Sequence, residues 1–591
     1  MSYMSEPYTF TRNKVVFDYT AVFCKTHDEL LQSELFEEVL KRFVNRLEHK
    51  ESPLFVFFKK NVEFAKNEEL VDFLIDLFRL LVSHKIDEIV RFKAEYLAVL
   101  SDIENMLESI EELYNFWRRF ERFLYMEAPK RSHYTKQSVH HEQFIQSNVD
   151  LKKMVIGTYR HIRENLTGKN PRTYRQLPAG VNMGMLLESI EWDCPDYLSS
   201  IKNTPFVRLT LMEAPLILYP TMTKRKGAFQ EIQQLYDEML QIQANQFIVF
   251  PAKVGELLAF IYFHFDFISQ GLSLCNLFEI AEYEEIDGKR PDIILLFGVD
   301  NIRYPANTVF LDDDKNTLMI GFARHAEEMD YFGYFKKFAL TMHNLVMMKR
   351  NRLPVHGAMF HLKLKNGSTA SVVIVGDSGA GKSETLEAFR AHCEDYVNDI
   401  KIIFDDMGCL RINATHTQIV GFGTEIGAFV RLDDLQPGYA YEEIDRSIFM
   451  NPDKTNARLI IPVTTYQNIV KGFKVDLVLY ANNYENVSDD NNIIDFFDNA
   501  KDAIDVFRSG QRLAKGTTDE KGIVRTYFAN PFGPPQRKDA HEELARLYFD
   551  SFFELGIKVG QIRTRLGIEG FEQEGPKAAA LALIDVIKGL K

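Results

Sequence analysis

Two hydrophobic patterns divide this chain. Between residues 28 and 125, apolar residues recur at spacings of three and four, and Pro and Gly are almost absent. This period predicts amphipathic helices, most clearly in "ELVDFLIDLFRLLVSHKIDEIVRFKAEYLAVL" and "DIENMLESIEELYNFWRRFERFLYM". We therefore expect an all-helical N-terminal domain over residues 1–150. A helical bundle of this kind suits binding of a protein partner or self-association, and we find no catalytic motif in it.

From about residue 200 onward, short runs rich in β-branched and aromatic residues alternate with turns and helical segments. Examples are "FVRLTLM", "LILYP", "FIVFP", "DIILLFG", "NTVFLDD" and "TLMIGFA". This alternation predicts a mixed α/β (α+β) region that continues to the C-terminus. The longest apolar stretch, "GELLAFIYFHFDFISQGLSLCNLF", carries Glu256, His264 and Asp266. These polar residues favour a buried helix over a membrane span.

Composition narrows the function classes. The formal net charge of -14 over 591 residues argues against a general nucleic-acid binder, since phosphate backbones require clustered Lys and Arg. The five cysteines are scattered without a CxxC pair, which is typical of reduced thiols. The first residues, "MSYMSEPYTFTRNKVV", contain no apolar signal segment. We expect a cytoplasmic protein that has neither a nucleic-acid nor a membrane partner.

The strongest motif is "GDSGAGKSE" at residues 376–384, which lies between the β-type run "SVVIV" and the helical run "TLEAFRAHC". It fits the pattern G-x-x-x-x-G-K-[ST] in the strand–loop–helix context of a phosphate-binding loop. Backbone N–H groups would surround the phosphates, Lys382 would reach the terminal phosphates, and the Ser383 hydroxyl would ligate a metal. The predicted nucleotide-binding residues of the loop are Gly376, Ser378, Gly379, Ala380, Gly381, Lys382 and Ser383.

An acidic pair follows the loop closely. Asp405 and Asp406 end the apolar run "DIKIIFDD", 23 and 24 residues after Lys382. Adjacent carboxylates at a strand end suit Mg²⁺ or Mn²⁺, but this separation is shorter than in most P-loop nucleotidases. Upstream lie Lys336, Lys337 and His356, which alone would be interpreted as a surface pair and a core histidine. Their order before the loop and the acidic pair indicates one combined site.

These segments resemble the phosphoenolpyruvate carboxykinases, mainly the ATP-dependent type. The similar segments, in the family's order, are "YFGYFKK", "PVHGAM", "GDSGAGKS", "FDDMG", "GTEIGAFVR", "NARLIIP", "RSGQRLAKGTTDEKG" and "TYFANPFGPP". The resemblance covers roughly residues 300–570. It implies a two-lobed carboxykinase-like fold, with a substrate-side lobe over 151–320 and a nucleotide and metal lobe over 321–591.

The resemblance also implies a reaction. Oxaloacetate would lose CO₂, and the enolate would take the γ-phosphoryl group of a nucleoside triphosphate to give phosphoenolpyruvate. ATP is the expected donor, with GTP or pyrophosphate as alternatives, and Mn²⁺ and Mg²⁺ are the expected metals. Lids over residues 433–456 or 509–522 are both compatible with the sequence.

Roles follow by resemblance. Lys337, His356 and Asp406 would hold Mn²⁺, whereas Ser383 and Asp405 would serve the nucleotide-bound Mg²⁺. The cations around the transferred phosphoryl group would be Lys336, Lys382 and Arg458. Tyr331 and Ser378 would lie on the substrate side, and Glu425 would orient the cluster.

The chain departs from the family's pattern in several segments, and one of them concerns the substrate. The "TGRSPKDKF"-like segment, whose arginine binds the substrate carboxylate, has no counterpart here, and Arg225 in "PTMTKRKGAF" is the nearest candidate. The loop itself is closer to that of HPr kinase, which shares the fold. The alternatives are therefore a phosphotransferase acting on a protein serine or a small-molecule hydroxyl, and a non-catalytic nucleotide-binding regulator.

Overall fold

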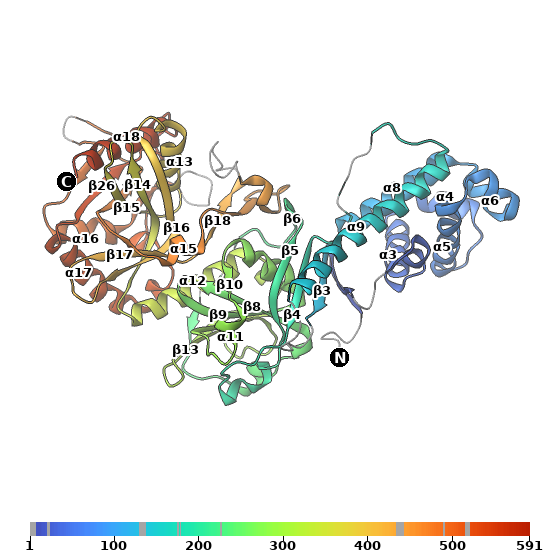
Figure 1. Cartoon of the computed structure of the whole chain (residues 1–591), viewed down its shortest axis with the longest axis horizontal. Coiled ribbons are helices and arrows are strands. Elements are labelled where there is room, and N and C mark those ends of the chain that lie inside the picture. Colours follow the sequence, from blue (N-terminus) through green and yellow to red (C-terminus); the bar gives the residue numbers. More distant parts are fainter. Residues whose placement is uncertain are drawn as a thin grey trace. The chain divides into compact units, whose positions relative to one another are not determined.

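The computed structural model divides the chain into two compact units (Figure 1). The first comprises Met1–Ser189 and Val207–Glu213, and the second comprises Ile190–Phe206 and Ala214–Lys591. The structure describes residues 7–19, 24–128, 137–173, 177, 179–224, 227, 229–432, 443–488, 491–514 and 521–590.

The first unit contains the helices that the apolar period predicts. Its helices are α2 (His27–Leu31), α3 (Glu34–His49), α4 (Pro53–Asn61), α5 (Asn67–Ser83), α6 (Ile86–Phe92), α7 (Leu97–Leu100), α8 (Ile103–Arg119) and α9 (Gln137–Thr167). Side chains cap several N-termini, as Ser33 does for α3 and Asp102 for α8. The apolar faces of these helices form one core.

This unit is not all helical, which corrects the prediction. It also contains strands β1 (Tyr8–Thr11), β2 (Lys14–Asp18), β3 (Glu121–Glu127), β4 (Met183–Glu188) and most of β5 (Phe206–Met212). The run "ERFLYME" was expected to continue a helix, but it forms β3 between the parallel strands β2 and β4. Burial explains the difference, because six of its seven residues are buried on both faces. The Arg122 side chain lies within this core and donates to the carbonyls of Gly180 and Phe120 at 2.6 and 2.8 Å.

The second unit begins with a mixed sheet in the order β8–β9–β11–β13–β12–β7, with β10 beside β8. Its strands are β7 (Gln230–Glu231), β8 (Phe247–Val254), β9 (Leu257–His264), β10 (Glu279–Ile280), β11 (Ile293–Val299), β12 (Thr308–Asp313) and β13 (Leu318–Arg324). Most of these are strands that the sequence predicts. The stretch 255–278 is a correction, since its first part forms β9, and only a short helix α10 (Ile268–Ser273) follows. A continuous apolar run is also typical of a strand that is buried on both faces.

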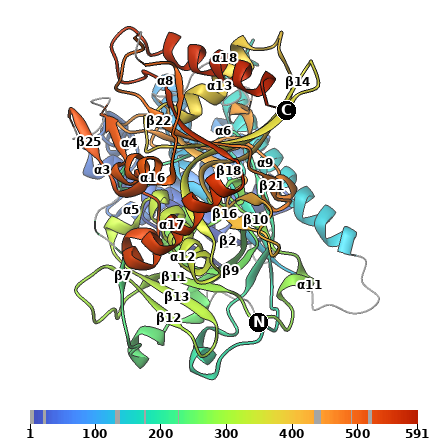
Figure 2. The ribbon, with the colours of Figure 1, turned by 90° about the vertical axis from the view of Figure 1, so that its left-hand side faces the viewer.

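A second sheet of this unit has the order β21–β17–β16–β14–β15–β22–β26–β23. Its strands are β14 (Leu353–Leu364), β15 (Thr369–Val375), β16 (Val397–Ile412), β17 (Ile419–Gly423), β21 (Phe473–Lys474), β22 (Leu477–Asn482), β23 (Ile494–Phe496) and β26 (Lys558–Arg563). Helices α13 (Lys382–His392) and α18 (Glu574–Lys588) cover one face, and α16 (Ala500–Ser509) and α17 (Lys538–Glu554) cover the other (Figures 1 and 2). The result is an α/β/α layering with the phosphate loop at the end of β15.

Three further features bear on the site. Helix α12 (Phe332–Lys349) carries the Lys336–Lys337 pair. A small sheet has the order β18–β20–β19–β6, formed by β18 (Gly427–Arg431), β20 (Arg458–Pro462), β19 (Ile448–Met450) and β6 (Leu216–Leu218). The hairpin of β24 (Gln511–Leu513) and β25 (Ile523–Arg525) lies close to the phosphate loop through Arg512.

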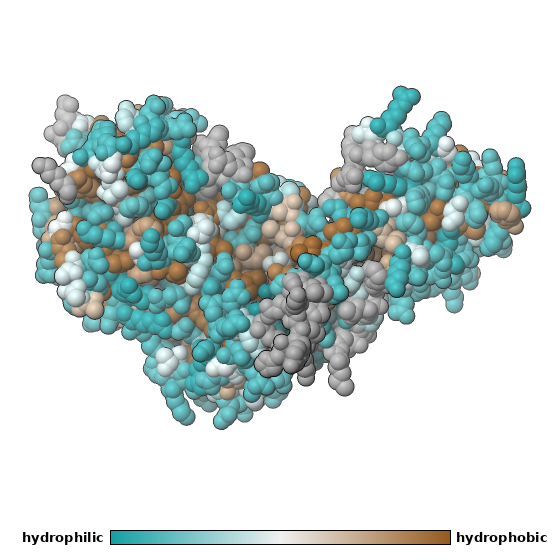
Figure 3. Space-filling model, viewed as in Figure 1, coloured by the Kyte–Doolittle hydropathy of each residue, from teal (hydrophilic) through white to brown (hydrophobic). Residues whose placement is uncertain are grey.

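All five cysteines are free thiols, as the sequence predicts. Within the described ranges, no helix has both the length and the apolar character needed to cross a bilayer. The face drawn in Figure 3 is mostly hydrophilic, with apolar residues in small patches.

Candidate active site

The phosphate loop has the backbone that its glycines allow. It connects β15 to α13, and Gly379 and Gly381 have φ values of 76° and 95°. At Gly381 a Cβ would lie 2.5 Å from Thr564 Oγ1, so no larger residue fits there. The Thr564 hydroxyl donates to the Ala380 carbonyl at 2.8 Å and fixes the loop from β26. The Lys382 side chain is buried, and its Nζ lies 3.3 Å from the Asp377 carbonyl oxygen.

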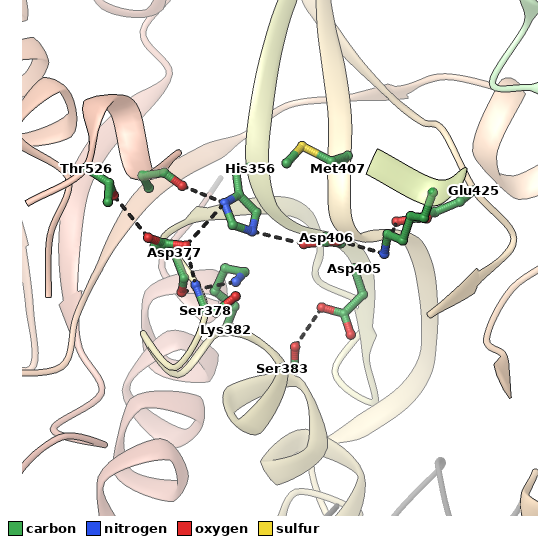
Figure 4. A network of polar contacts seen from close by, with 12 residues as sticks. His356, Asp377, Ser378, Lys382, Ser383, Asp405, Asp406, Met407, Glu425 and Thr526 are labelled. Atoms are coloured by element: carbon green, nitrogen blue, oxygen red, sulfur yellow. Dashed lines mark hydrogen bonds and ion pairs between the residues drawn. The ribbon is translucent and has the colours of Figure 1, made fainter. Parts of the chain in front are cut away.

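Asp377 is a loop residue that the sequence did not single out. Its Oδ1 accepts a hydrogen bond from the Ser378 N–H at 2.8 Å. Its Oδ2 accepts from Arg512 Nε at 3.3 Å and from Thr526 Oγ1 at 3.1 Å. Asp377 therefore ties the loop to two segments that lie more than a hundred residues later, and Figure 4 shows it beside His356 and Ser378.

The acidic pair connects the loop to a second cluster (Figure 4). Ser383 Oγ donates to Asp405 Oδ1 at 2.8 Å. The next residue, Asp406, has Oδ1 2.9 Å from His356 Nε2 and Oδ2 2.7 Å from Lys336 Nζ. Pairing of β14 with β16 brings His356 alongside this acidic pair. The His356 Nδ1 lies 2.5 Å from the Ala529 carbonyl oxygen, which makes Nδ1 the protonated nitrogen and turns Nε2 toward Asp406.

Buried charges compensate one another in this cluster. Lys336 Nζ lies 3.2 Å from Glu425 Oε1 in addition to its contact with Asp406. Burial opposes the charge of Lys336, but Asp406 and Glu425 outweigh it and keep the pKa of Lys336 above its ordinary value. Although burial opposes its charge as well, Lys336 and His356 hold the pKa of Asp406 well below its ordinary value. Burial raises the pKa of Glu425 to about 8 in spite of Lys336. Lys336 is thus the cation that keeps Asp406 ionised, whereas burial outweighs it at Glu425.

Lys337 has a different environment from Lys336. Its Nζ lies 4.9 Å from the Phe532 ring centroid, and that ring lies 6.0 Å from the His356 ring. A cavity of about 190 Å³ adjoins Lys337 and Phe532. The three residues that the resemblance assigns to Mn²⁺ are Lys337, His356 and Asp406. Asp406 contacts Lys336, and the Phe532 ring lies near both Lys337 and His356.

The small sheet supplies two arginines and an aromatic contact. Arg458 on β20 pairs directly with Arg431 on β18, so two cations occupy opposite positions of neighbouring strands. The Arg458 guanidinium lies 5.5 Å from the Phe429 ring centroid, and Tyr331 packs against the same ring at 5.9 Å. Like charges placed opposite each other destabilise a strand pair unless neighbouring groups compensate them.

The segment before Arg225 is fixed next to these residues. Asp330, which precedes Tyr331, accepts from Thr221 N and Oγ1 at 2.8 and 2.7 Å. Asn451, which follows β19, donates to the Pro220 carbonyl at 2.8 Å. Arg225 itself lies outside the described residues, as do positions 433–442 and 515–520 of the two predicted lids.

The donor atoms fit the metals that the resemblance implies. A serine hydroxyl and a carboxylate, as at Ser383 and Asp405, suit Mg²⁺ beside a nucleotide. A carboxylate, an imidazole nitrogen and a neutral amine, as Asp406, His356 and Lys337 would supply, suit Mn²⁺. A scan against protein-family models and a search of curated proteins found no match for this chain. The functional argument therefore depends on the residues and their geometry.

Proposed function

We propose that this chain is a phosphoenolpyruvate carboxykinase-like enzyme that converts oxaloacetate and a nucleoside triphosphate to phosphoenolpyruvate, CO₂ and the diphosphate. One observation carries the proposal. Ser383 Oγ is 2.8 Å from Asp405 Oδ1, while the adjacent Asp406 is 2.9 Å from His356 and 2.7 Å from Lys336. A phosphate loop and a nitrogen–carboxylate cluster are thereby joined through two consecutive residues.

The nucleotide half follows from the loop. Its N–H groups and Lys382 stabilise the negative charge of the β- and γ-phosphates, which the helix α13 N-terminus also favours. Bound Mg²⁺ would neutralise the phosphate oxygens, with Ser383 and Asp405 as the residues that hold it. The remaining charge on the transferred group would be met by Lys336 and Arg458.

The substrate half must form and trap an enolate. The bond between C3 of oxaloacetate and its carboxyl carbon breaks, CO₂ leaves, and the electron pair becomes the enolate. The enolate oxygen then bonds to the γ-phosphorus as the bond to the bridging oxygen breaks. Bound Mn²⁺ would polarise the substrate oxygens, with His356, Asp406 and Lys337 as the residues that would hold it. Tyr331 and Arg458 would orient the anionic substrate and the phosphoryl group.

A kinase of the same fold is the second candidate. The "GDSGAGKSE" loop favours it. In addition, this chain has no counterpart of the family segment whose arginine binds the oxaloacetate carboxylate. Such an enzyme would transfer the γ-phosphoryl group to a protein serine or to a small-molecule hydroxyl. The same Lys382, Ser383 and Asp405 would serve it, so the acceptor distinguishes the two reactions.

The test is phosphoenolpyruvate formation by the full-length protein. Oxaloacetate, Mn²⁺ and Mg²⁺ are supplied with ATP, GTP or pyrophosphate in turn, and Lys382→Ala is the matched negative control. We expect turnover with ATP and none above background in the variant. Nucleotide binding without turnover on any donor would support the kinase candidate and direct the search to another acceptor. Failure to bind any donor would overturn both reactions and also the alternative of a non-catalytic nucleotide-binding regulator.

A further inference from the structure

Four polar residues meet at the ends of three adjacent strands of the first sheet of unit two. Strands β9, β11 and β13 are parallel neighbours, so their carboxyl ends lie at one edge (Figure 2). His264 is the last residue of β9, Asp300 directly follows β11, and His325 directly follows β13. Asp266 lies in the short 3₁₀ turn after β9. We call these four residues the strand-end cluster.

The contacts within the cluster converge on one carboxylate. Asp266 Oδ2 is 2.8 Å from His325 Nε2 and 3.6 Å from His264 Nδ1. The two imidazole rings lie 4.7 Å apart between centroids. One ligand atom from each of these three residues lies within 4.8 Å of the others, so a single ion can contact all three after small side-chain shifts.

The fourth residue contacts the other ring nitrogen of His325. His325 Nδ1 lies 3.1 Å from Asp300 Oδ1. When an ion replaces the proton on Nε2, the proton on Nδ1 can still be donated to Asp300. Carboxylate–histidine pairs of this kind orient metal-binding imidazoles and increase their basicity. His264 Nδ1 accepts from the Asp266 N–H at 3.2 Å, so it is the unprotonated nitrogen, and an ion bound at Nδ1 would replace this hydrogen bond.

The backbone is shaped to admit the first histidine. Gly298 has φ 99° and lies at an irregularity in the pairing of β11 with β13. A Cβ at this position would lie 2.6 Å from the His264 Cβ. A bulge beside a cluster of polar side chains is typical of functional positions, since it redirects the chain locally. The side chains of His264, Asp266 and His325 remain 16%, 37% and 31% exposed, which leaves an entry path and space for water ligands.

We propose that His264, Asp266 and His325 bind a divalent transition-metal ion of the Zn²⁺ class, with Asp300 as the residue that positions His325. Two imidazoles and one carboxylate are a ligand set of such ions, and a hard ion such as Mg²⁺ would require more oxygen ligands. The cluster shares no residue with the phosphate-loop site, so this site is independent of the proposed reaction.

The experiment uses Co²⁺ as a spectroscopic probe on the untagged full-length protein. The His356→Ala/Asp406→Asn variant removes the imidazole and the carboxylate of the proposed Mn²⁺ site. Ser383 and Asp405 remain, but a hydroxyl and one carboxylate bind Co²⁺ only weakly without nucleotide. We expect this variant to bind one Co²⁺ with the visible absorption of a four- or five-coordinate site, and we expect Zn²⁺ to displace it. Adding His325→Gln or Asp266→Asn should weaken binding about 100-fold or more, and Asp300→Asn about 10- to 100-fold.

Unfolding is measured separately, so that a loss of fold is not taken for a loss of ligand. Each variant is melted without metal, and only variants with an intact transition are titrated. Two ligand variants, His325→Gln and Asp266→Asn, are used so that one folded variant suffices. Absence of Co²⁺ binding in the His356→Ala/Asp406→Asn variant would overturn the proposal. Unchanged binding after loss of His325 or Asp266 would overturn it equally.

Discussion

The phosphate-loop site and the strand-end cluster belong to the same unit, but they balance charge in opposite ways. In the first, Lys336 lies against Asp406 and Glu425, and Arg512 lies against Asp377. In the second, the carboxylates of Asp266 and Asp300 are the dominant charges near His325, and they raise its pKa. Cations assembled around a phosphate loop suit an anionic ligand. Carboxylates around histidines suit a cation.

Burial makes the difference matter. The Lys336 side chain is 4% exposed, whereas His325 is 31% exposed. A buried charge that loses its partner costs several kcal/mol, but water screens a charge that is a third exposed. Single substitutions should therefore have large effects on stability at the first site, and their main effect at the second should be on ligand binding.

The largest effect is expected from Lys382→Ala. In the proposed reaction a positive charge at the transferred phosphoryl group is worth about 10²–10⁵ in rate, so we expect turnover to fall at least about 10²-fold. Lys401→Ala on strand β16 is the control, because the Lys401 side chain is about half exposed. The measurement is kcat for phosphoenolpyruvate formation, with Co²⁺ binding at the strand-end cluster as the readout that should not move. A rate within tenfold of the unmodified protein would remove Lys382 from catalysis.

The adjacent lysines provide a matched pair for the next effect. Lys336→Met should destabilise the metal-free protein by about 3–5 kcal/mol, since it leaves the ionised Asp406 buried without this cation. Lys337→Met should cost less, because the contact with the Phe532 ring that it removes is worth about 1 kcal/mol.

Chemical denaturation without metal measures both variants, and turnover with Mn²⁺ separates their roles. The resemblance predicts that each variant loses turnover. Equal stability losses would contradict the assignment of Lys336 as the cation that keeps Asp406 ionised.

Contiguous motifs explain how much of the first site could be predicted. The loop from Gly376 to Ser383 and the pair Asp405–Asp406 are local in sequence, and each follows an apolar run that predicts a strand. The partners of Asp377 were missed, since Arg512 and Thr526 come from segments whose position depends on tertiary packing. The strand-end cluster was missed for the same reason. Nothing local indicates that β9, β11 and β13 are adjacent in the sheet, so His264 was interpreted as a polar residue in a buried helix.

The hydrophobic period did not distinguish helix from strand where a segment is buried on both faces. The runs that form β3 and β9 are apolar at successive positions, so they fit a buried helix and a buried strand equally well. In β3, backbone carbonyls within the fold accept the hydrogen bonds of Arg122, and a sequence does not show those acceptors. The strands of β8, β12 and β13 were predicted correctly, because turn residues separate their short runs.

The stability of the protein is expected to depend on pH through His541, a residue next to the phosphate-loop site. His541 on α17 is buried, and its Nδ1 lies 2.9 Å from the Tyr527 hydroxyl, close to the 526–529 segment that contacts Asp377 and His356. Burial lowers the pKa of His541 to about 4. Because the pKa is lowered in the folded state, stability is complete above the ordinary value of 6.5 and is lost progressively as pH falls from 6.5 to about 4.

His541→Gln removes this titration. We expect the stability difference between the unmodified protein and the variant to shrink by about 3 kcal/mol between pH 7.5 and pH 4. Urea denaturation midpoints at several pH values measure it. A difference that stays constant over this range would mean that His541 is not held neutral.

The smallest effect is expected at the bulge of the strand-end cluster. Gly298→Ala places a Cβ 2.6 Å from the His264 Cβ at a φ of 99°, so strain and displacement of the histidine should together cost about 2–3 kcal/mol. Gly288→Ala is the matched control, since its φ is 65° and nothing lies within 4 Å of the added Cβ, so only about 1 kcal/mol is expected. Melting temperatures give the stability difference, and Co²⁺ titration gives the effect on the cluster. Only Gly298→Ala should weaken Co²⁺ binding, because it moves a ligand. Equal Co²⁺ affinities in the two variants would show that the bulge does not position His264. The difference between the two sites would then lie in their charges alone.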